Sequence, residues 1–465
     1  MNDTRLTDEE KRDRRYKELT EGKLYPLLVK MAIPSMIGMM VATVYSMTDT
    51  YFVGKLNNTD MTAAVGIVYT FISVVQAIGF WFGYGSGNYI SRMLGKKEIE
   101  NAKTMAAKGV ILGLITGVVI LILGIIFVKP LAFLLGGSAS QGVLDATVSY
   151  LKITVISVPF MIISNILYNE LRLAASSRAS MTGLLVGMLI NMILDPVFIH
   201  ILNMGIQGAA YASLIGQIMG VIVLWRSTGR DGNVPIELKR GRPDRFHTME
   251  ILKGGAPNFC RQGISSISSV LLNRTAGMFG VNAIAAITIA VRIAYICYAL
   301  VIGFGQGFQP VCAINYGAGK YARLKRAFKL TLMTVTVFLI ASSALIYFNS
   351  GSFVYKFTRD ENVIPYATDM LKAQLIIMPF MGYYILIGML LQNIGKFGRA
   401  TMVTISENGL FLIPSVIILP QIFGLNGLIW CKPVASILAL GFSVMIGFPA
   451  WHQFLNTDNK KENEE

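Results

Sequence analysis

Charged residues are scarce in this 465-residue chain: they make up 14% of it, whereas hydrophobic residues make up 54%. A soluble domain carries about a quarter of its residues as charges, so a soluble globular protein is excluded. Histidine occurs only three times, at distant positions, and the four cysteines show neither metal-ligand nor pairing spacing. We therefore expect no bound metal or cofactor, and the lack of a His-bearing nucleophile constellation argues against a membrane enzyme.

Long apolar runs dominate the chain instead, and Val110–Val128 is one of them. A helix that crosses a bilayer needs about 20 apolar residues. Twelve such segments are expected, starting near residues 27, 61, 107, 143, 179, 207, 255, 283, 327, 362, 400 and 427. None alternates with the period of two that marks barrel strands, so we predict an all-α membrane protein with twelve transmembrane helices.

Short strings recur in the same order along the chain. Ile78–Gly83, of the form Ile-Gly-Phe-x-x-Gly, returns as Ile302–Gly307, 224 residues later. Three more pairs recur at offsets of 223 to 219 residues: 32–34 with 255–257, 159–161 with 379–381, and 205–208 with 424–427. The chain is therefore two copies of a six-helix unit, for which we predict two pseudo-twofold-related lobes. Duplicated transporters typically hold their site where the copies meet.

Lysine and arginine fall mainly on one side of the predicted spans. The segments 1–23, 91–108, 226–253 and 316–329 carry seven, five, seven and five of them. The opposite connections hold only Lys55, Lys129, Lys356 and Arg359. Basic loops stay in the cytoplasm, so we expect a multi-pass protein of a bacterial inner membrane with both termini cytoplasmic. This bias explains the net charge of +15 without a nucleic-acid partner.

Polar stretches mark the expected domain boundaries, and no cleavable signal peptide is evident. We expect a mobile cytoplasmic tail (1–23), an N-terminal lobe (24–226), a cytoplasmic linker (227–250), a C-terminal lobe (251–455) and a second tail (456–465).

Prolines recur at equivalent places of the two copies: Pro34 and Pro257 open the first span, and Pro159 and Pro379 break the fourth. They are either kinks that neighbouring helices accommodate or bending points.

A carboxylate inside a bilayer is costly and calls for a function. Asp49 lies in the first span, and Asp195 lies in the fifth span, four residues after Asn191 and thus on the same helical face. Two nearby carboxylates cannot both ionise cheaply, so either one holds a proton or a cation sits between them. This is the chemistry of a coupling site. The alternative is that Asp195 only caps a helix break beside Pro196.

Several motifs, in order, resemble the MATE (multidrug and toxic compound extrusion) family, and in particular its DinF-like branch. They are Pro34, Thr48–Gly54, Asn191–Ile199, Gly208–Ser213, Gly305–Pro310 and Asn315–Ala318. The resemblance implies a transporter that exports organic cations, drugs or amphipathic metabolites in antiport with protons or sodium ions. It places the coupling site on Asp49, Asn191, Asp195 and Ser213. The acidic residues of the NorM-like branch are missing here, because 264–266 and 381–383 contain no carboxylate.

The substrate cavity is harder to predict. Candidates that bring polar or aromatic groups into the spans are Tyr45, Gln76, Phe80, Phe160, Gln306 and Gln309. Asn165 and Asn169 either extend this polar face or join helices by hydrogen bonds. Glu170, beside Arg172 and near the cytoplasmic end of its span, is expected to form a local ion pair or to act as an interface anchor. Glu407 either pairs with Arg261, Arg274 or Arg292, which the cost of an unpaired buried acid favours, or faces the cavity as a drug-binding anion.

The expected partners are a small, hydrophobic, cationic substrate and membrane lipid, and the protein is expected to act as a monomer. A flippase for lipid-linked precursors, from the same superfamily, is the alternative function. It would require a strongly cationic cavity, whereas most Lys and Arg residues of this chain lie in the predicted cytoplasmic loops.

Overall fold

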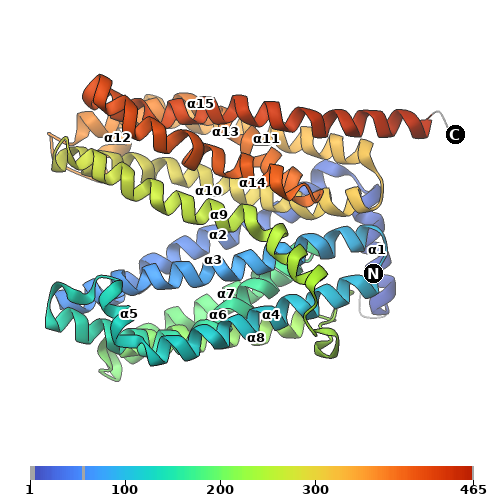
Figure 1. Ribbon diagram of the computed structural model, residues 1–465, viewed down its shortest axis with the longest axis horizontal. Coiled ribbons are helices and arrows are strands. Elements are labelled where there is room, and N and C mark those ends of the chain that lie inside the picture. The colour runs from blue at the N-terminus through green and yellow to red at the C-terminus, as the bar shows by residue number, and fades with distance from the viewer. Residues whose placement is uncertain (1–5, 55–57, 463–465) are drawn as a thin grey trace. The chain divides into compact units, whose positions relative to one another are not determined.

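The computed structural model describes residues 6–54 and 58–462, and the side chains of 42–51, 139 and 450–462 are outside this description. Every regular element in the described part is a helix, as predicted (Figure 1). The first half contains α1 (Asp8–Glu21), α2 (Leu24–Gly54), α3 (Thr59–Gly95), α4 (Ile99–Ile126), α5 (Val128–Leu134), η2 (Gly137–Ala139), α6 (Gln141–Leu173), α7 (Ser177–Pro196), η3 (Val197–Ile201) and α8 (Gly205–Ser227).

The second half repeats this order after a short helical turn in the linker. It contains η4 (Leu238–Arg240), α9 (Arg245–Gly277), α10 (Val281–Gly317), α11 (Tyr321–Phe348), α12 (Ser350–Tyr355), α13 (Ile364–Asn393), α14 (Phe397–Ile405), η5 (Ser406–Phe411) and α15 (Leu412–Glu462). The helices η3 and η5 are π-helices, whereas η2 and η4 are 3₁₀ turns. α15 continues into the stretch that the sequence analysis treats as a polar tail.

Ten helical segments in the described part are long and apolar enough to cross a membrane. The last of them, Phe397–Pro449, changes direction at Gly424, whose φ is 57°. Gly205, its counterpart in the first copy, also has a φ of 57° and opens α8. Only glycine adopts this conformation without strain. The helix is interrupted at Gly424, so this segment contains two membrane spans. The twelfth span is α9, which is more polar than the ten segments above. The twelve-helix fold is therefore confirmed.

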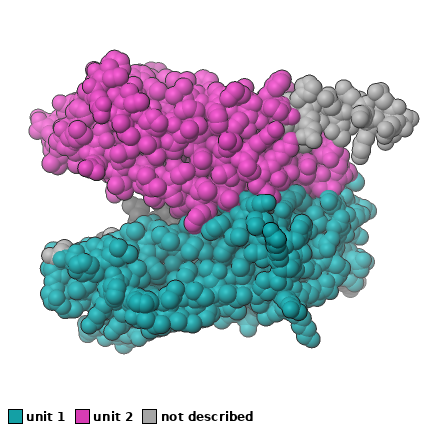
Figure 2. All heavy atoms as spheres, in the orientation of Figure 1, with its two compact units in different colours: residues 1–22, 37–255 teal, residues 23–36, 256–465 magenta. Residues whose placement is uncertain are grey.

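The chain divides into two compact units, which Figure 2 colours separately. Unit 1 contains residues 1–22 and 37–255, and unit 2 contains residues 23–36 and 256–465. The two repeats therefore exchange their first helical segments: the start of α2 belongs to unit 2, and the start of α9 belongs to unit 1. Both divisions fall close to the paired prolines Pro34 and Pro257.

Glycines allow these exchanged segments to pack closely. In unit 2, a Cβ on Gly307 would lie 2.5 Å from Cα of Ala32, at the start of α2. In unit 1, a Cβ on Gly85 would collide with the carbonyl of Ile251, and Trp81 Nε1 donates to the carbonyl of Leu252 at 2.8 Å. Backbone-to-backbone packing of this kind is typical of helices in a membrane, where small residues let the chains approach.

The prolines at the fourth span of each copy do not interrupt it. Pro159 lies inside the continuous helix α6, and Pro379 lies inside α13. The prediction of a break at these positions was wrong. The neighbouring helices accommodate the proline rings: Gly117 of α4, for instance, leaves room where a Cβ would lie 2.8 Å from Cα of Pro159.

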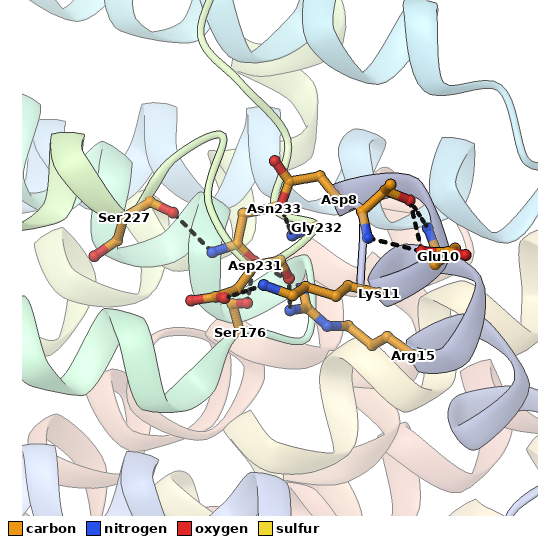
Figure 3. A network of polar contacts seen from close by, with 10 residues as sticks. Asp8, Glu10, Lys11, Arg15, Ser176, Ser227, Asp231, Gly232 and Asn233 are labelled. Atoms are coloured by element: carbon orange, nitrogen blue, oxygen red, sulfur yellow. Dashed lines mark hydrogen bonds and ion pairs between the residues drawn. The ribbon is translucent and has the colours of Figure 1, made fainter. Parts of the chain in front are cut away.

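Within the predicted N-terminal tail, Asp8–Glu21 form the helix α1. Thr7 caps α1 through a capping box with Glu10, and α1 lies against the linker (Figure 3). Arg15 donates from Nη1 to Oδ1 of Asn233 and from Nη2 to the carbonyl of Asp231, both at 2.7 Å. Lys11 also pairs with the Asp231 carboxylate at 2.9 Å. The capping box of Thr7 and Glu10 is visible in the sequence and marks the start of a helix even in a polar segment.

Candidate functional site

Close packing of α7 against α8 positions the buried polar residues of unit 1. A Cβ on Gly216 of α8 would lie 2.7 Å from the carbonyl oxygen of Gly187 and 3.0 Å from Cβ of Asn191, both on α7. Any larger residue at position 216 would push the helices apart. The glycine therefore brings Asn191 within hydrogen-bonding distance of Ser213, which lies three residues before Gly216 on α8.

Three of the four predicted coupling residues come together at this contact. Nδ2 of Asn191 lies 3.0 Å from Oγ of Ser213 and 3.4 Å from Oδ1 of Asp195. Asp195 is 0% exposed and Asn191 is 2% exposed, whereas Ser213 is half-buried. A carboxylate so deeply buried needs a proton, a cation or several donors to offset the cost of its charge.

The backbone after Asp195 departs from regular α-helix. Pro196 has no N–H, so it cannot donate to the carbonyl four residues earlier, and α7 gives way to the π-helix η3. Wider helical turns of this kind occur frequently at functional sites. Asp195 accepts a hydrogen bond from Asn191 on its own helical face, which is the pairing that the four-residue spacing predicts.

The fourth predicted residue, Asp49, lies outside the described side chains, as does Tyr45 of the predicted cavity. The same helix contains Phe52, whose side chain is described. The Phe52 ring of α2 lies 6.4 Å from the His200 ring of η3, centroid to centroid.

The cavity candidates of unit 1 with described side chains lie on α3 and α6. Gln76 and Phe80 on α3 are half-buried, as are Phe160 and Asn165 on α6. Nδ2 of Asn165 donates to the Met161 carbonyl at 2.9 Å, one turn earlier.

Asn169 is fully buried, and its Nδ2 donates to the Asn165 carbonyl at 2.8 Å. Gly79 and Gly83 of α3 pack directly on this face of α6, since a Cβ on Gly83 would lie 3.0 Å from Cβ of Asn169. The two asparagines therefore pack at a close helix contact and bond back to their own helix. Gln306 and Gln309, the candidates in unit 2, are both buried on α10.

The described contacts of Arg172 and of Glu170 are with different neighbours, and an ion pair between the two is not among them. The Arg172 guanidinium donates to Oδ1 of Asn169 at 3.0 Å and lies 5.1 Å above the Tyr84 ring. The Glu170 carboxylate turns toward α3 and α4, where a Cβ on Gly109 would lie 2.7 Å from Oε1. The two side chains diverge because they lie two residues apart on a helix and thus on different faces.

An arginine partner was the favoured expectation for Glu407, because an unpaired buried charge is costly, and this partner is not seen among the described residues. In the part of the chain that the structure describes, it forms no ion pair with Arg261, Arg274 or Arg292. Its carboxylate accepts a hydrogen bond from Oγ of Ser436 at 3.1 Å. Ser436 lies on a different helix, so the spacing in the sequence gave no signal for this contact.

Comparison with known proteins matches the chain to one family over most of its length. A family model described as MatE matches residues 34–197 and 257–418, one match in each copy of the repeat. The multidrug export protein MepA of Staphylococcus haemolyticus is 27% identical over 427 residues, which is 92% of this chain and 94% of that protein. MepA of Staphylococcus aureus (strain NCTC 8325 / PS 47) is 27% identical over 428 residues, with the same shares.

Solved structures share the fold. A MATE crystal structure in the bent conformation aligns with a TM-score of 0.88 at 24% identity, covering 95% of this chain and 99% of that one. A multidrug resistance MATE family transporter of the MOP superfamily, in an outward-facing conformation, aligns with a TM-score of 0.85 at 24% identity, covering 95% and 98%.

Proposed function

This chain belongs to the MatE family, a family of transporters and not of enzymes, and from that premise we propose that it exports hydrophobic organic cations in antiport with protons or sodium ions. The MepA relatives are multidrug exporters, and they match this chain over nearly its whole length. We further propose that it acts as a monomer in the inner membrane, with both termini in the cytoplasm. The basic segments that α1 and the linker contribute support this orientation.

One observation carries the antiport proposal: Asp195 is fully buried, and Asn191 connects it to Ser213 across the α7–α8 contact. Protonation of Asp195, or binding of a sodium ion there, removes the cost of a buried charge. The two forms of the carboxylate then favour different packing of α7 against α8. The π-helix η3 is the segment in which such a change is accommodated, because its hydrogen bonding is already irregular.

In the proposed cycle, a proton or sodium ion from outside binds at the pair Asp195 and Asp49 and cancels one of its two negative charges. The helices of unit 1 then rearrange and the bound cation leaves outward. Release of the ion into the cytoplasm restores the charged state. The coupling ion is a co-substrate here, and both ions suit a carboxylate with amide and hydroxyl neighbours.

Transport in everted membrane vesicles tests the proposal. A fluorescent amphipathic cation is added, and a pH gradient and a sodium gradient are imposed separately. Wild-type protein is expected to accumulate the dye under one of the two gradients. Asp195→Asn is expected to lose this response, because the amide cannot take up a proton or carry the charge.

The matched control is Asp145→Asn, which changes an exposed aspartate at the start of α6 in the same unit. It is expected to transport like wild type. Gradient-driven transport by Asp195→Asn at the wild-type rate contradicts the coupling role, and absence of transport by the wild-type protein under both gradients contradicts the antiport proposal itself.

A further inference from the structure

A second buried carboxylate lies in unit 2 and has no part in the coupling proposal. Glu407 lies in the π-helix η5 and is only 4% exposed. Its described hydrogen bond is with the neutral hydroxyl of Ser436, and no basic side chain of the described residues pairs with it. A buried carboxylate without a cationic partner is costly, so a cation that binds beside it is favoured.

Two tyrosines from different helices interact electrostatically with the same carboxylate. The hydroxyl of Tyr384, on α13, interacts with both Glu407 and Ser436. Tyr384 is 5% exposed, and its hydroxyl makes no hydrogen bond of regular geometry within the described residues. Tyr298, on α10, interacts with Glu407 and also with Arg261 of α9. The site thus combines the Glu407 carboxylate with the hydroxyls of Ser436, Tyr384 and Tyr298.

The backbone at Glu407 is held in its irregular form by α9. The Ser268 hydroxyl of α9 donates to the carbonyl of Asn408, inside the π-helix. Gly409 allows the close approach, because a Cβ there would lie 2.8 Å from Cγ2 of Ile264. A π-helix is rare and costs regular hydrogen bonding, so its stabilisation beside a buried acid indicates a functional position.

We propose that Glu407, Tyr384 and Ser436 form a recognition site for amphipathic cations that carry an N–H group, such as protonated amines. This inference rests on the proposed export of organic cations and specifies which of them unit 2 selects. A carboxylate offers about four lone-pair positions, and Ser436 occupies one of them. The others accept N–H donors from a substrate, while Tyr298 and Tyr384 contact the positive charge through their rings. A quaternary ammonium ion has the positive charge but no N–H group, so it cannot donate a hydrogen bond to the carboxylate.

A pair of fluorescent probes that differ only by N-methylation tests the proposal: one is a protonated tertiary amine and the other is its quaternary ammonium analogue. Equilibrium binding is measured on purified protein in lipid nanodiscs. A hydrogen bond to a charged group predicts about a tenfold preference of the wild type for the N–H probe. Glu407→Gln is expected to reduce this preference to less than about threefold, because a neutral carboxamide is a weaker acceptor.

Glu361→Gln is the matched control, since it neutralises an exposed glutamate of the same unit, and it is expected to keep the wild-type preference. If Glu407→Gln does not give monodisperse protein, Glu407→Asp takes its place, because it keeps the charge but withdraws the carboxylate by one methylene. An unchanged preference in the folded variant overturns this inference alone. If the wild-type protein binds neither probe, the proposed export of organic cations fails with it.

Discussion

Replacing Gly232 by alanine is expected to release α1 from the linker while the membrane helices stay in place. Gly232 has a φ of +74°, and a Cβ there would lie 2.8 Å from the amide nitrogen of Arg12 and 2.9 Å from the carbonyl oxygen of Asp8. Both atoms belong to the backbone at the start of α1, so neither can move aside without moving the helix. The Gly232 amide also donates to the Asp8 carboxylate at 3.1 Å.

The size of the effect follows from the bonds that would be lost. An alanine in the left-handed region costs about 1–2 kcal/mol by itself. The two hydrogen bonds of the Arg15 guanidinium contribute about 1.5 kcal/mol or more each, since the donor is charged. The pair between Lys11 and Asp231 adds little, because the Asp231 side chain is 76% exposed. Loss of about 3 kcal/mol of docking free energy lowers the docked fraction about a hundredfold.

Gly229→Ala is the matched control, because Gly229 lies in the same loop with a φ of +70°. A Cβ on Gly229 would meet only Pro235, at 3.2 Å, so this variant carries the left-handed strain without touching α1. The measurement is limited trypsin digestion, since α1 contains arginines and lysines that trypsin cleaves when the helix is undocked. Gly232→Ala is expected to lose its N-terminal fragment at least about ten times faster than Gly229→Ala. Equal rates would show that α1 is not held by this contact.

Two further predictions concern the linker and the candidate site. The ammonium of Lys11, hydrogen-bonded to Asp231, lowers the pKa of that carboxyl, so its share of the docking free energy is present above about pH 4 and disappears as the pH falls through the lowered pKa. Because this exposed pair adds little to docking, the anisotropy of a dye on Glu9→Cys should fall only slightly on acidification, and Asp231→Asn should remove that small dependence; an identical pH profile in this variant would contradict the assignment. Gly216→Ala should destabilise unit 1 by about 1–3 kcal/mol and reduce transport, because the methyl group separates Asn191 from Ser213. Gly441→Ala, where a Cβ meets nothing within 4 Å, should leave the thermal unfolding temperature unchanged or slightly raised, and a similar loss in both variants would argue against close packing as the cause.

The sequence alone was sufficient for the helix count because each span must be apolar over a fixed length, whatever it packs against. It also indicated the pairing of Asn191 with Asp195, since residues four apart share a helical face. The repeated Gly-x-x-Gly at 205–208 and 424–427 marks the same backbone feature twice, because left-handed φ is a property of glycine itself. Such features depend on one residue or one turn, so no knowledge of distant contacts is needed.

Other repeated strings have different partners in the two copies. Gly79 and Gly83 pack against α6, whereas Gly303 and Gly307 pack against the start of α2. The glycines of the repeated string allow another helix to pack closely against them, but they do not determine which helix packs there. For the same reason, an arginine was the expected partner of Glu407 in the sequence, whereas the structure places Ser436 beside it.

The amino-acid sequence by itself determined the membrane class, the duplication, the number of spans and the pairing of residues within one helix. These properties follow from apolar length, local repeats and helical period, all of which act over a few neighbouring residues. The tertiary structure decided which helices meet: the contact of Asn191 with Ser213, the hydroxyl beside Glu407, the exchange of the first helical segments and the docking of α1. Those contacts join residues far apart in the chain, and they depend on which surfaces pack together with the greatest gain in free energy, which local patterns do not encode.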